Sequence, residues 1–501
     1  MNEIRLYKIA ELTGNSPDKR GLDIKITSIC YDSRKATSGS AFFCLIGSNL
    51  DGHDYALDAY SRGCRVFVCE RVPSGFPKRG TKLIIAKQGT RAALADVAAE
   101  FYGHPEKTLK LVGITGPQGK TTTAELTYAI LNKNGIKAGY IGTNGIKFDE
   151  YKFASVNTTP ESCDLFEYLS MMVKTGVKIA VIEVSSQALM VGRVRGISFD
   201  TAVFTNLYHD HIGGAEHPTF ENYKECKKLL FSEHCARVAV INADAPEAKE
   251  FSSVIPEGVT KKTCSIISKA DYKGEALRQR RDALGVGIEF VCRIDGDLTN
   301  VNINIPGEFN AMNALEAIAV CHTYGVSLSG IADALESSYI DGRFEVIHIN
   351  GVDFVIDYAH NGESLRAVLT TLRSYEPRRL ICLYGSVGGR TQMRRSELGK
   401  VAAALADFSI LTSDNPAAED PMNIINDIAA EYVEGKEYIA IPDRREAIEY
   451  AFRNAKDGDI VLLAGKGHEK YQLIGTRREP FCERDILREL EKSPALIAET
   501  V

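Results

Sequence analysis

The sequence predicts an α/β protein of three domains built around a central, doubly wound sheet. Three observations lead to this fold class. At 501 residues the chain is too long for one hydrophobic core, and domains of roughly 100 to 200 residues imply about three. Short apolar runs alternate with helical patterns, as in parallel sheets covered by helices. A glycine-rich segment lies between an apolar strand at 109–114 and a helix-forming stretch at 124–132.

The first domain is predicted over residues 1–108 as a small α/β unit. Short apolar runs precede a helix at about 91–101, and the segment from Gly103 to Lys107 then breaks the pattern. The strands are expected at 41–46, 64–69 and 82–86.

The second domain, over 109–342, and the third, over 343–501, repeat the alternation of strands and helices. In the third, Rossmann-like domain each apolar run ends in a polar cluster, and such clusters gather at the carboxyl edge of an open sheet. Ligand-binding loops are therefore expected there. The second domain has predicted strands at 179–184, 201–207 and 238–242 and helices at 310–324 and 329–335; the third has strands at 354–358, 380–384, 408–411 and 460–463.

Composition narrows the class of protein. Charged residues make up 25% of the chain and the net charge is -6, which gives no reason to expect nucleic acid or an anionic membrane as a partner. The twelve cysteines form no CxxC pair, so we expect reduced, structural thiols. The first residues lack the apolar core of a signal peptide. A cytoplasmic enzyme is predicted.

The segment from Gly113 to Thr122 has the features of a nucleotide phosphate loop. Its glycines allow backbone N–H groups to approach phosphate oxygens, and the following helix presents its positive end. Lys120 would reach the β- and γ-phosphates and Thr121 would bind Mg²⁺. The spacing of the glycines differs from the usual Walker pattern. The sequence thus predicts that ATP is a substrate, and that the loop which binds it is a variant of the Walker pattern.

Two further strand ends carry side chains suited to metal binding. Glu183 ends a strand of the sheet that bears the phosphate loop, so a second Mg²⁺ contact is favoured over a solvated acid. Asp210 and His211 follow the next strand in the same way. From its position alone, His211 is as compatible with packing as with metal binding.

Lys227 interrupts the apolar stripe of a predicted helix. A lysine turned inward has a lowered pKa, and its neutral amine can take up CO₂ to form an anionic carbamate that binds metal. Spacing alone favours the other interpretation, in which the aliphatic stem packs and the ammonium reaches water.

These motifs, with others in the same order, resemble those of the Mur ligase family over nearly the whole chain. The resemblance is closest to the members that add the third residue to UDP-N-acetylmuramoyl-L-alanyl-D-glutamate. The family's phosphate loop has the spacing found here, which explains the departure from the Walker pattern. The remaining landmarks are Asp32 to Arg34, Asn157 to Glu161, Glu183 to Ser186, Phe204 to His211, Tyr223 to Lys227, Gly307 to Asn313, Gly342 to Glu345, and Asp357 to His360.

The resemblance implies a role for each landmark. It reverses the interpretation of Lys227, which is then expected as a carbamate that binds a second Mg²⁺. The implied metal ligands are Thr121, Glu183, His211 and the Lys227 carbamate, and the implied catalytic residues are Lys120, Lys227, Glu183, His211 and Arg343. The implied ATP site comprises Thr115, Gly116, Gly119, Lys120, Thr121, Thr122, Asn310, Arg343 and Asp357; the UDP-muramoyl dipeptide site comprises Ser33, Asn157, Thr158, Thr159, Ser185 and Arg193.

The implied reaction adds an amino acid through an acyl phosphate. Family members that add meso-diaminopimelate usually carry Asp-Asn-Pro-Arg, whereas this chain has Ala417 at the last position. Alanine cannot form the charge-assisted contact to the extra carboxylate, so L-lysine is predicted, with meso-diaminopimelate or L-ornithine as alternatives. Glu419 and Asp420 are equally compatible with a direct role and with an ordinary loop charge pair. The implied acceptor site comprises Arg390, Asp414, Asn415, Ala417, Gly465 and Glu469.

Two other functions compete with this one. A folylpolyglutamate-type ligase shares the ATP machinery, but the predicted uridine-binding first domain argues against it. A P-loop switch ATPase needs neither the inward lysine nor a third domain with ligand loops. A monomer without nucleic-acid or membrane partners is expected.

Overall fold

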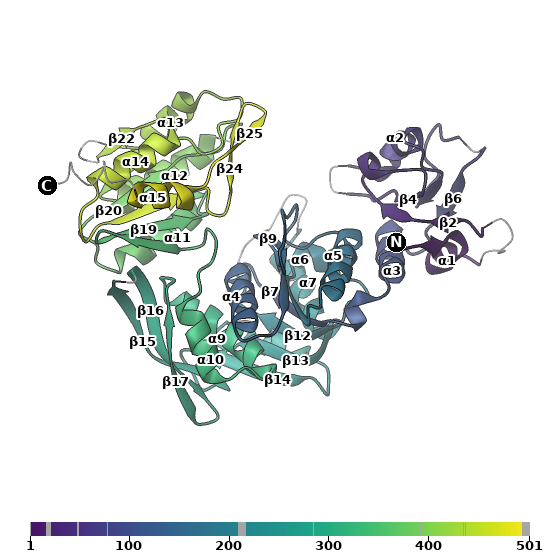
Figure 1. Ribbon diagram of the computed structural model, residues 1–501, viewed down its shortest axis with the longest axis horizontal. Helices are drawn as coiled ribbons and strands as arrows, with labels where there is room; N and C mark the ends of the chain where they lie inside the picture. The colour runs from purple at the N-terminus through teal and green to yellow at the C-terminus, as the bar shows by residue number, and fades with distance from the viewer. Residues whose placement is uncertain are drawn as a thin grey trace. The chain divides into compact units, whose positions relative to one another are not determined.

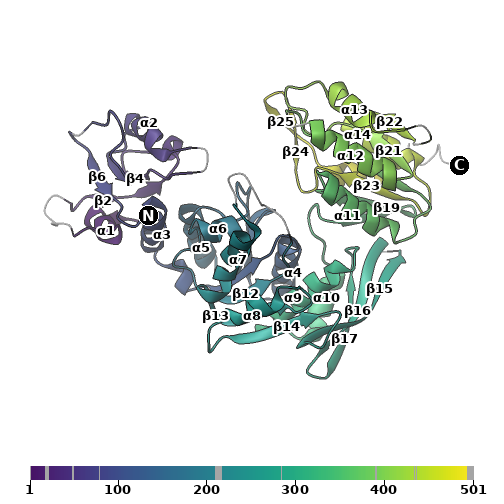
Figure 2. The same ribbon diagram turned by 180° about the vertical axis from the view of Figure 1, so that it is seen from behind.

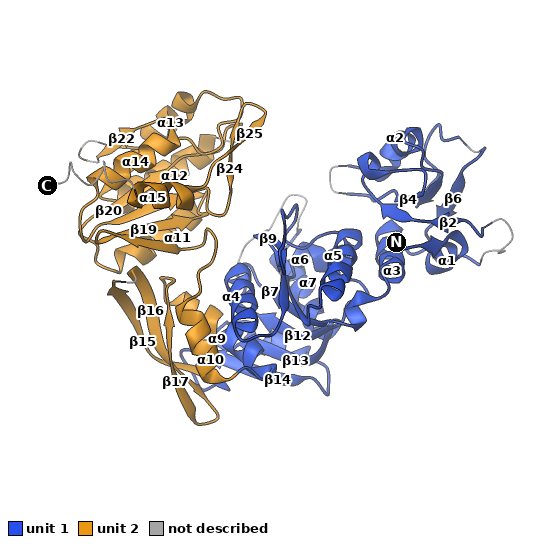
Figure 3. Cartoon of the chain, viewed as in Figure 1, with its two compact units in different colours: residues 1–272, 316–326 blue, residues 273–315, 327–501 orange. Residues whose placement is uncertain are grey.

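A computed structural model describes residues 2–16, 22–47, 50–77, 79–208, 217–283, 285–389, 392–433, 435 and 437–492. The chain divides into two compact units (Figure 3). Unit 1 contains Met1–Tyr272 and Glu316–Val326, and unit 2 contains Lys273–Leu315 and Ser327–Val501. The division into three domains at 108/109 and 342/343, expected from the sequence, stays a prediction. Within the described residues, no helix is both long enough and apolar enough to cross a membrane.

The first part of unit 1 is a four-stranded parallel sheet in the order β3-β4-β5-β6. The three predicted strands are present, each slightly shorter than expected, whereas β3 and the first helix were not predicted. The elements are α1 (Leu6–Leu12), β3 (Ser28–Cys30), β4 (Ser40–Phe43), α2 (Ala56–Ser61), β5 (Val66–Cys69), β6 (Lys82–Ile85) and α3 (Thr90–Phe101). This confirms a small α/β region at the start of the chain.

The rest of unit 1 contains eight strands of a larger, 11-stranded sheet, in the order β10-β9-β8-β11-β7-β12-β13-β14, and β15, β16 and β17 complete this sheet. All pairs from β8 to β14 are parallel, and β9 and β10 add an antiparallel edge. The strands are β7 (Lys110–Thr115), β8 (Ala138–Gly142), β9 (Gly145–Phe148), β10 (Tyr151–Phe153), β11 (Ile179–Glu183), β12 (Phe199–Phe204), β13 (Cys235–Asn242) and β14 (Thr260–Ser265).

The strand order reverses at β7. The chain places β8 and β11 on one side of β7 and then crosses to β12 on the other, and ligands bind at such switch points. Figure 1 shows α4 on one side of β7 and α5, α6 and α7 on the other. The doubly wound core is therefore confirmed. The helices are α4 (Lys120–Lys133), α5 (Ser162–Lys174), α6 (Ser186–Met190), α7 (Phe220–Ser232) and α8 (Ala248–Ser253).

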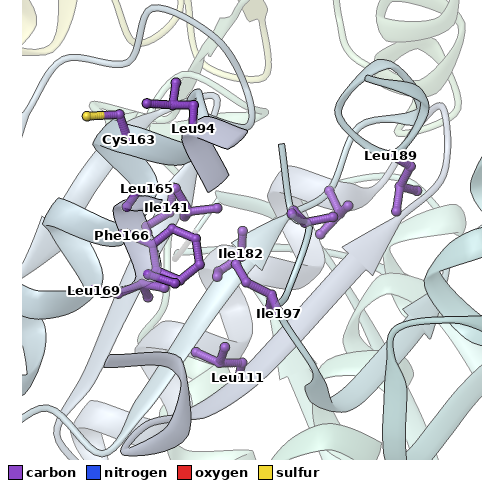
Figure 4. Packing of buried hydrophobic residues seen from close by; sticks show 14 of the residues in the cluster. Leu94, Leu111, Ile141, Cys163, Leu165, Phe166, Leu169, Ile182, Leu189 and Ile197 are labelled. Atoms are coloured by element: carbon purple, nitrogen blue, oxygen red, sulfur yellow. The ribbon is translucent and has the colours of Figure 1, made fainter. Parts of the chain in front are cut away.

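Apolar packing holds the strands that lead to the switch point. Figure 4 shows Phe166 and Leu169 of α5 beside Ile182 of β11, and all belong to one buried cluster with Leu111 of β7. Gly113 is needed in β7, because a Cβ there would lie 2.8 Å from the Phe199 ring. The carboxyl ends of β7 and β11 are thus held by a packed core.

Unit 2 contains a six-stranded sheet in the order β18-β19-β23-β20-β21-β22, flanked by helices (Figures 1 and 2). It is parallel except for the β18–β19 pair. Its strands are β18 (Glu345–Ile349), β19 (Val352–Asp357), β20 (Leu380–Tyr384), β21 (Phe408–Leu411), β22 (Tyr438–Ala440) and β23 (Ile460–Ala464); its helices are α11 (Gly362–Arg373), α12 (Gln392–Leu405), α13 (Pro421–Ala429), α14 (Arg444–Asn454) and α15 (Glu483–Glu491).

Further elements precede or follow this Rossmann-like sheet in the chain, and one of them, α9, begins in unit 2 and ends in unit 1. An antiparallel pair, β16 with β17, was not predicted, because its residues alternate without the long apolar runs of the parallel strands. The short hairpin β24–β25 follows β23 in the chain. These elements are β15 (Tyr272–Asp282), β16 (Gly285–Ile294), β17 (Asp297–Ile303), α9 (Phe309–Thr323), α10 (Leu328–Glu336), β24 (Tyr471–Ile474) and β25 (Arg477–Pro480).

The twelve cysteines all remain free thiols, and eleven of them are buried. Burial raises the pKa of the Cys292 thiol to about 12. The cysteines therefore serve as small core residues, as the sequence predicted.

A fully buried carboxyl group joins α9 to the helix that follows the phosphate loop. Thr123 Oγ1 of α4 donates a 2.9 Å hydrogen bond to Glu316 Oε2, and burial raises the pKa of Glu316 to about 8 from an ordinary 4.5. The folded chain thus keeps this proton over a range in which the unfolded chain has lost it. Stability should therefore fall as the pH rises from about 4.5 to about 8, by up to about 1.4 kcal/mol per pH unit.

We expect Glu316→Gln to remove this dependence, because glutamine is a neutral substitute for the protonated acid. The difference in melting temperature, variant minus wild type, should therefore increase steadily from pH 5 to pH 8. Glu336→Gln, at the end of α10, serves as the control and should follow the wild type. If the melting temperatures of Glu316→Gln and the wild type change in parallel with pH, Glu316 is ionised in the folded chain.

Candidate active site

The phosphate loop lies at the switch point, between the end of β7 and the first residue of α4. Gly119 has φ of 82°, in the left-handed region, and a Cβ on Gly116 would lie 2.0 Å from Thr205 Oγ1. Both positions therefore require glycine. Lys120 Nζ donates to the carbonyl oxygens of Gly116, at 2.6 Å, and Pro117, at 3.0 Å. The ammonium is thus held over the loop at the positive end of α4.

The strand beside the loop ends earlier than the sequence predicted, at Phe204 instead of 207. The residues that follow turn towards the loop. Thr205 Oγ1 donates to the Gln118 carbonyl oxygen at 2.7 Å, and Asn206 exchanges hydrogen bonds with the Gln118 backbone at 3.1 and 3.2 Å. Thr205 and Asn206 therefore fix the shape of the loop.

Glu183, at the end of β11, is fully buried and surrounded by neutral donors. Its Oε1 accepts from the Tyr140 hydroxyl at 2.5 Å and the Thr143 backbone N–H at 3.0 Å. Its Oε2 accepts from the hydroxyls of Thr121, at 3.0 Å, and Thr143, at 3.1 Å. Burial and the Glu183 charge raise the pKa of Tyr140 well above its ordinary value, so the phenol stays a donor.

This arrangement fits a divalent cation. Among the described residues, no positively charged side chain contacts Glu183, and a buried carboxylate without a counter-charge is costly. The carboxylate and the Thr121 hydroxyl are hard oxygen donors of the kind that Mg²⁺ prefers. Thr121 and Glu183, which the sequence assigned to the metal, are therefore brought together at the loop.

The predicted second metal position is described in part. Lys227 lies on α7 with 1% exposure, its Nζ 4.5 Å from the centre of the Tyr223 ring. The inward direction of the lysine is thus observed, and the carbamate stays a prediction. Asp210 and His211 lie outside the described residues. Within the described residues, no group of three or more His, Cys, Asp and Glu side chains is arranged to hold a metal.

Three of the residues predicted to bind the UDP substrate, Thr158, Thr159 and Ser185, lie beside Glu183. Thr158 Oγ1 is 3.2 Å from Thr143 Oγ1, which also contacts Glu183. Thr159 Oγ1 donates to the Glu183 carbonyl oxygen at 2.8 Å and accepts from the Ser185 N–H at 3.0 Å. Ser185 in turn caps α6. These contacts place the predicted substrate residues next to the phosphate loop.

Arg193 is buried and already paired. Its guanidinium donates to Glu161 Oε1 at 2.9 Å and to the Thr159 carbonyl oxygen at 3.2 Å. Arg91 of α3 holds the other oxygen of Glu161 at 2.7 Å. Arg193 therefore supports the Thr159 segment in this structure. Ser33 lies on a 3-10 helix, Ser33–Lys35, in the first sheet region, and Asn157 precedes Thr158 in a loop.

In unit 2, the predicted nucleotide contacts lie at three separate places, on α9, in the turn before β18 and at the end of β19. Asn310, near the start of α9, donates to the Pro306 carbonyl oxygen at 2.7 Å and accepts from Asn313 at 2.9 Å. Arg343 lies over the Tyr358 ring, 5.1 Å from its centre. Asp357, at the end of β19, accepts from two backbone N–H groups at 2.8 Å, and burial raises its pKa. Their roles towards ATP stay predictions.

Three of the predicted acceptor residues contact a buried lysine that was not assigned from the sequence. Lys466, fully buried, donates to Asn415 Oδ1 at 3.0 Å and to Glu469 Oε2 at 2.9 Å, and lies 3.6 Å from Asp414. Gly465 has φ of 109°, and a Cβ there would lie 2.8 Å from Asp414 Oδ2. An internal ammonium thus offsets part of the negative charge of Asp414 and Glu469.

Glu419 and Asp420, for which the sequence left two interpretations open, both have partners within the structure. Glu419 pairs with Arg395 at 2.7 Å, which lowers the pKa of Glu419, and Asp420 caps α13 by accepting from the Met422 N–H. These contacts favour the loop-charge interpretation over a direct role. Ala417 has φ of 52° and is held by backbone bonds to Leu473 and Gly475 of the β24–β25 hairpin. Arg390 lies outside the described residues.

Comparison with known proteins assigns the family. The model of the Mur ligase middle domain matches residues 114–321, that of the Mur ligase glutamate ligase domain matches 342–467, and that of the Mur ligase family catalytic domain matches 25–102. A UDP-N-acetylmuramoyl-L-alanyl-D-glutamate--2,6-diaminopimelate ligase of Clostridium botulinum is 39% identical, over 93% of this chain and 95% of the relative. The chain belongs to the Mur ligase family.

Further comparisons agree with this assignment. The Geobacillus thermodenitrificans ligase with the same description is 38% identical, over 94% of this Mur ligase and 95% of the relative. A solved structure described as such a 2,6-diaminopimelate ligase has a TM-score of 0.69 at 27% identity, covering both chains completely. The MurF ligase of Thermotoga maritima, solved with ADP, has a TM-score of 0.59 at 19% identity over 94% and 98% of the chains, which supports the fold.

Tyr140, Thr143 and Lys466 are the site residues of this Mur ligase that the sequence analysis missed. Tyr140 lies in an apolar strand, where a tyrosine is expected as a core residue. Its partner Glu183 is 43 positions away in the chain. Lys466 lies in the polar cluster from Gly465 to Glu469 that follows the last predicted strand, and this motif was the available signal.

Proposed function

We propose that this Mur ligase joins a diamino acid to UDP-N-acetylmuramoyl-L-alanyl-D-glutamate with conversion of ATP to ADP, in cytoplasmic peptidoglycan precursor synthesis. The observation that carries the proposal is the contact of Thr143 with both Glu183 and Thr158. It supports a nucleotide site and an acyl-substrate site that share one edge of the sheet. The names of the relatives support the substrate class.

The proposed reaction has two steps. A substrate carboxylate oxygen attacks the γ-phosphorus of ATP, and the bond from this phosphorus to the β,γ-bridging oxygen breaks. The products of this step are an acyl phosphate and ADP. The acceptor amine then attacks the acyl carbon, loses a proton, and displaces inorganic phosphate through a tetrahedral intermediate. This order is chemically sensible because a free carboxylate is a poor acyl donor, and phosphorylation supplies a good leaving group.

Different residues of this chain are proposed to bind the triphosphate, hold the metal ions and orient the acyl substrate. Lys120 and the N–H groups at the start of α4 offset the charge of the triphosphate, and Arg343 is proposed to contact the γ-phosphate. Thr121 and Glu183 would hold Mg²⁺, which supplies Lewis-acid stabilisation of the transferring phosphoryl group. Lys227, as its carbamate, and His211 are proposed to hold a second ion. Thr158, Thr159 and Ser185 are proposed to orient the acyl substrate.

The acceptor is a diamino acid, and two candidates rest on different observations. The relatives are named for 2,6-diaminopimelate, which favours this acceptor over the L-lysine expected from the sequence. Ala417 favours L-lysine, since no guanidinium is available at this position for a second carboxylate. ADP release should be measured with meso-diaminopimelate, L-lysine and L-ornithine, and the product masses determined. Turnover that is independent of every acceptor would indicate a switch ATPase instead.

Replacing Ala417 with arginine should shift the acceptor preference towards meso-diaminopimelate. The backbone at Ala417 is held by the β24–β25 hairpin, so a new guanidinium would extend from a fixed position. We expect the ratio of kcat/KM for meso-diaminopimelate to that for L-lysine to rise about tenfold or more. The control is Ala418→Arg, which adds the same charge at the adjacent, exposed position. An equal shift in both variants would refute a specific contact at 417.

A further inference from the structure

The Glu183 carboxylate accepts three hydrogen bonds from residues that lie outside the phosphate loop. Two groups from the turn after β8, the Thr143 N–H and hydroxyl, and one from the strand itself, the Tyr140 hydroxyl, donate to its two oxygens. These three donors come from one short stretch of chain, and none of them contacts the phosphate loop in the described structure. Their shared target is the carboxylate.

The space between Tyr140 and Glu183 has no room for another atom. A Cβ on Gly142 would lie 2.2 Å from Glu183 Oε1 and 2.4 Å from the Tyr140 hydroxyl oxygen. A side chain at 142 would have to displace one of the two. Glycine at the end of β8 is therefore what allows the phenol and the carboxylate to meet.

A carboxylate only accepts hydrogen bonds, which sets the direction of the contacts to Glu183. The Tyr140 hydroxyl accepts from the Asn144 N–H at 3.2 Å, so its own proton is available for Glu183. The Thr143 hydroxyl has a single proton. If it donates to Glu183 at 3.1 Å, it accepts from Thr158 at 3.2 Å. The same residue thus contacts the carboxylate and the proposed acyl-substrate segment.

We propose that Tyr140 and Thr143 are positioning residues that fix the Glu183 carboxylate in the orientation in which it receives the cation of the Mg²⁺–nucleotide complex. The inference rests on the proposed function, because it takes Glu183 as a metal-binding carboxylate. Hydrogen bonds to a ligating carboxylate orient it before the ion arrives, and loss of such a partner commonly costs 10- to 100-fold in metal affinity.

The test is nucleotide binding without turnover. Calorimetric titration of the full chain with the non-hydrolysable analogue AMPPNP gives one affinity with saturating Mg²⁺ and one with EDTA, and their ratio is the magnesium-dependent gain. We expect Tyr140→Phe and Thr143→Val each to reduce this gain about tenfold, with the affinity in EDTA within twofold of the wild type. Thr143→Ser keeps the hydroxyl and should retain the gain.

Tyr324→Phe is the matched control. Tyr324 also donates its phenol proton to a carboxylate of unit 1, Asp200, at 2.8 Å, and Asp200 lies near the start of β12, at the opposite end of the sheet. This variant should keep the full gain. A wild-type gain retained in both Tyr140→Phe and Thr143→Val would overturn the proposal, and so would an equal loss with and without Mg²⁺. The titration contains no acceptor, so its result does not depend on ligase activity. In a separate turnover assay, a wild type that shows the magnesium gain but forms no ligase product would refute the proposed function alone.

Discussion

Lys120→Met should reduce kcat/KM for ATP on the order of 10²- to 10³-fold. The Lys120 ammonium is held over the phosphate loop by the carbonyl oxygens of Gly116 and Pro117, at the start of α4. A cation in this position stabilises charge that develops on the transferring phosphoryl group, and such preorganised groups contribute on this scale. Initial rates of ADP release at varied ATP concentration measure the effect.

The control for this prediction is Lys110→Met. Lys110 begins β7, the strand that leads into the loop, but it is exposed and pairs with Asp200 at 3.3 Å. Surface pairs of this kind contribute about 0–1 kcal/mol, so the control should keep its turnover and nearly all of its stability. Turnover of Lys120→Met within a few fold of the control would contradict the assignment of the loop.

Lys227→Ala should lower turnover on the order of 10²-fold or more while the chain stays folded. Lys227 is almost fully buried on α7, where an alkylammonium without a functional role is rarely found. As a carbamate it would present two anionic oxygens for metal, and alanine presents none. Turnover is measured as acceptor-dependent ADP release, and folding by thermal melting.

Substitutions that differ in charge separate the carbamate from a simple cation. Lys227→Glu keeps an anion and should retain more turnover than Lys227→Arg, which keeps a cation. Lys228→Ala, one position further on the same helix, removes an ion pair with the exposed Glu225 and should keep the turnover of the wild type. Higher turnover in Lys227→Arg than in Lys227→Glu would reject the carbamate.

The sequence predicts the parts of the site that lie within single motifs. The phosphate loop and the strand that ends at Glu183 are recognisable because a short local pattern determines them: a glycine turn before a helix, and an apolar run that ends in an acid. The structure places both at the carboxyl ends of neighbouring parallel strands of one sheet, as expected. Helical spacing placed Lys227 on the apolar face of α7 but favoured an ammonium that reaches water, and only the family resemblance predicted the buried position that is observed.

Contacts between distant segments were not predictable in this way. Tyr140 meets Glu183 across the sheet because β8 and β11 are parallel neighbours, and a single sequence does not give that pairing. Lys466 illustrates the same limit. Its motif marks a ligand loop, but the pairing of its ammonium with Asn415 depends on how two loops of unit 2 approach each other. Arg193 was assigned to substrate, and its pairing with Glu161 became visible only in three dimensions.

The central claim is that the chain activates a carboxylate by phosphorylation, and isotope transfer tests this most directly. UDP-N-acetylmuramoyl-L-alanyl-D-glutamate labelled with ¹⁸O in its free carboxylates would be turned over with ATP, Mg²⁺ and the diamino acid that gives the highest rate. The released phosphate is then analysed by mass spectrometry. An acyl phosphate predicts one ¹⁸O atom in each phosphate, together with a product of tripeptide mass. Unlabelled phosphate would contradict the account, because water rather than the carboxylate would then have attacked ATP.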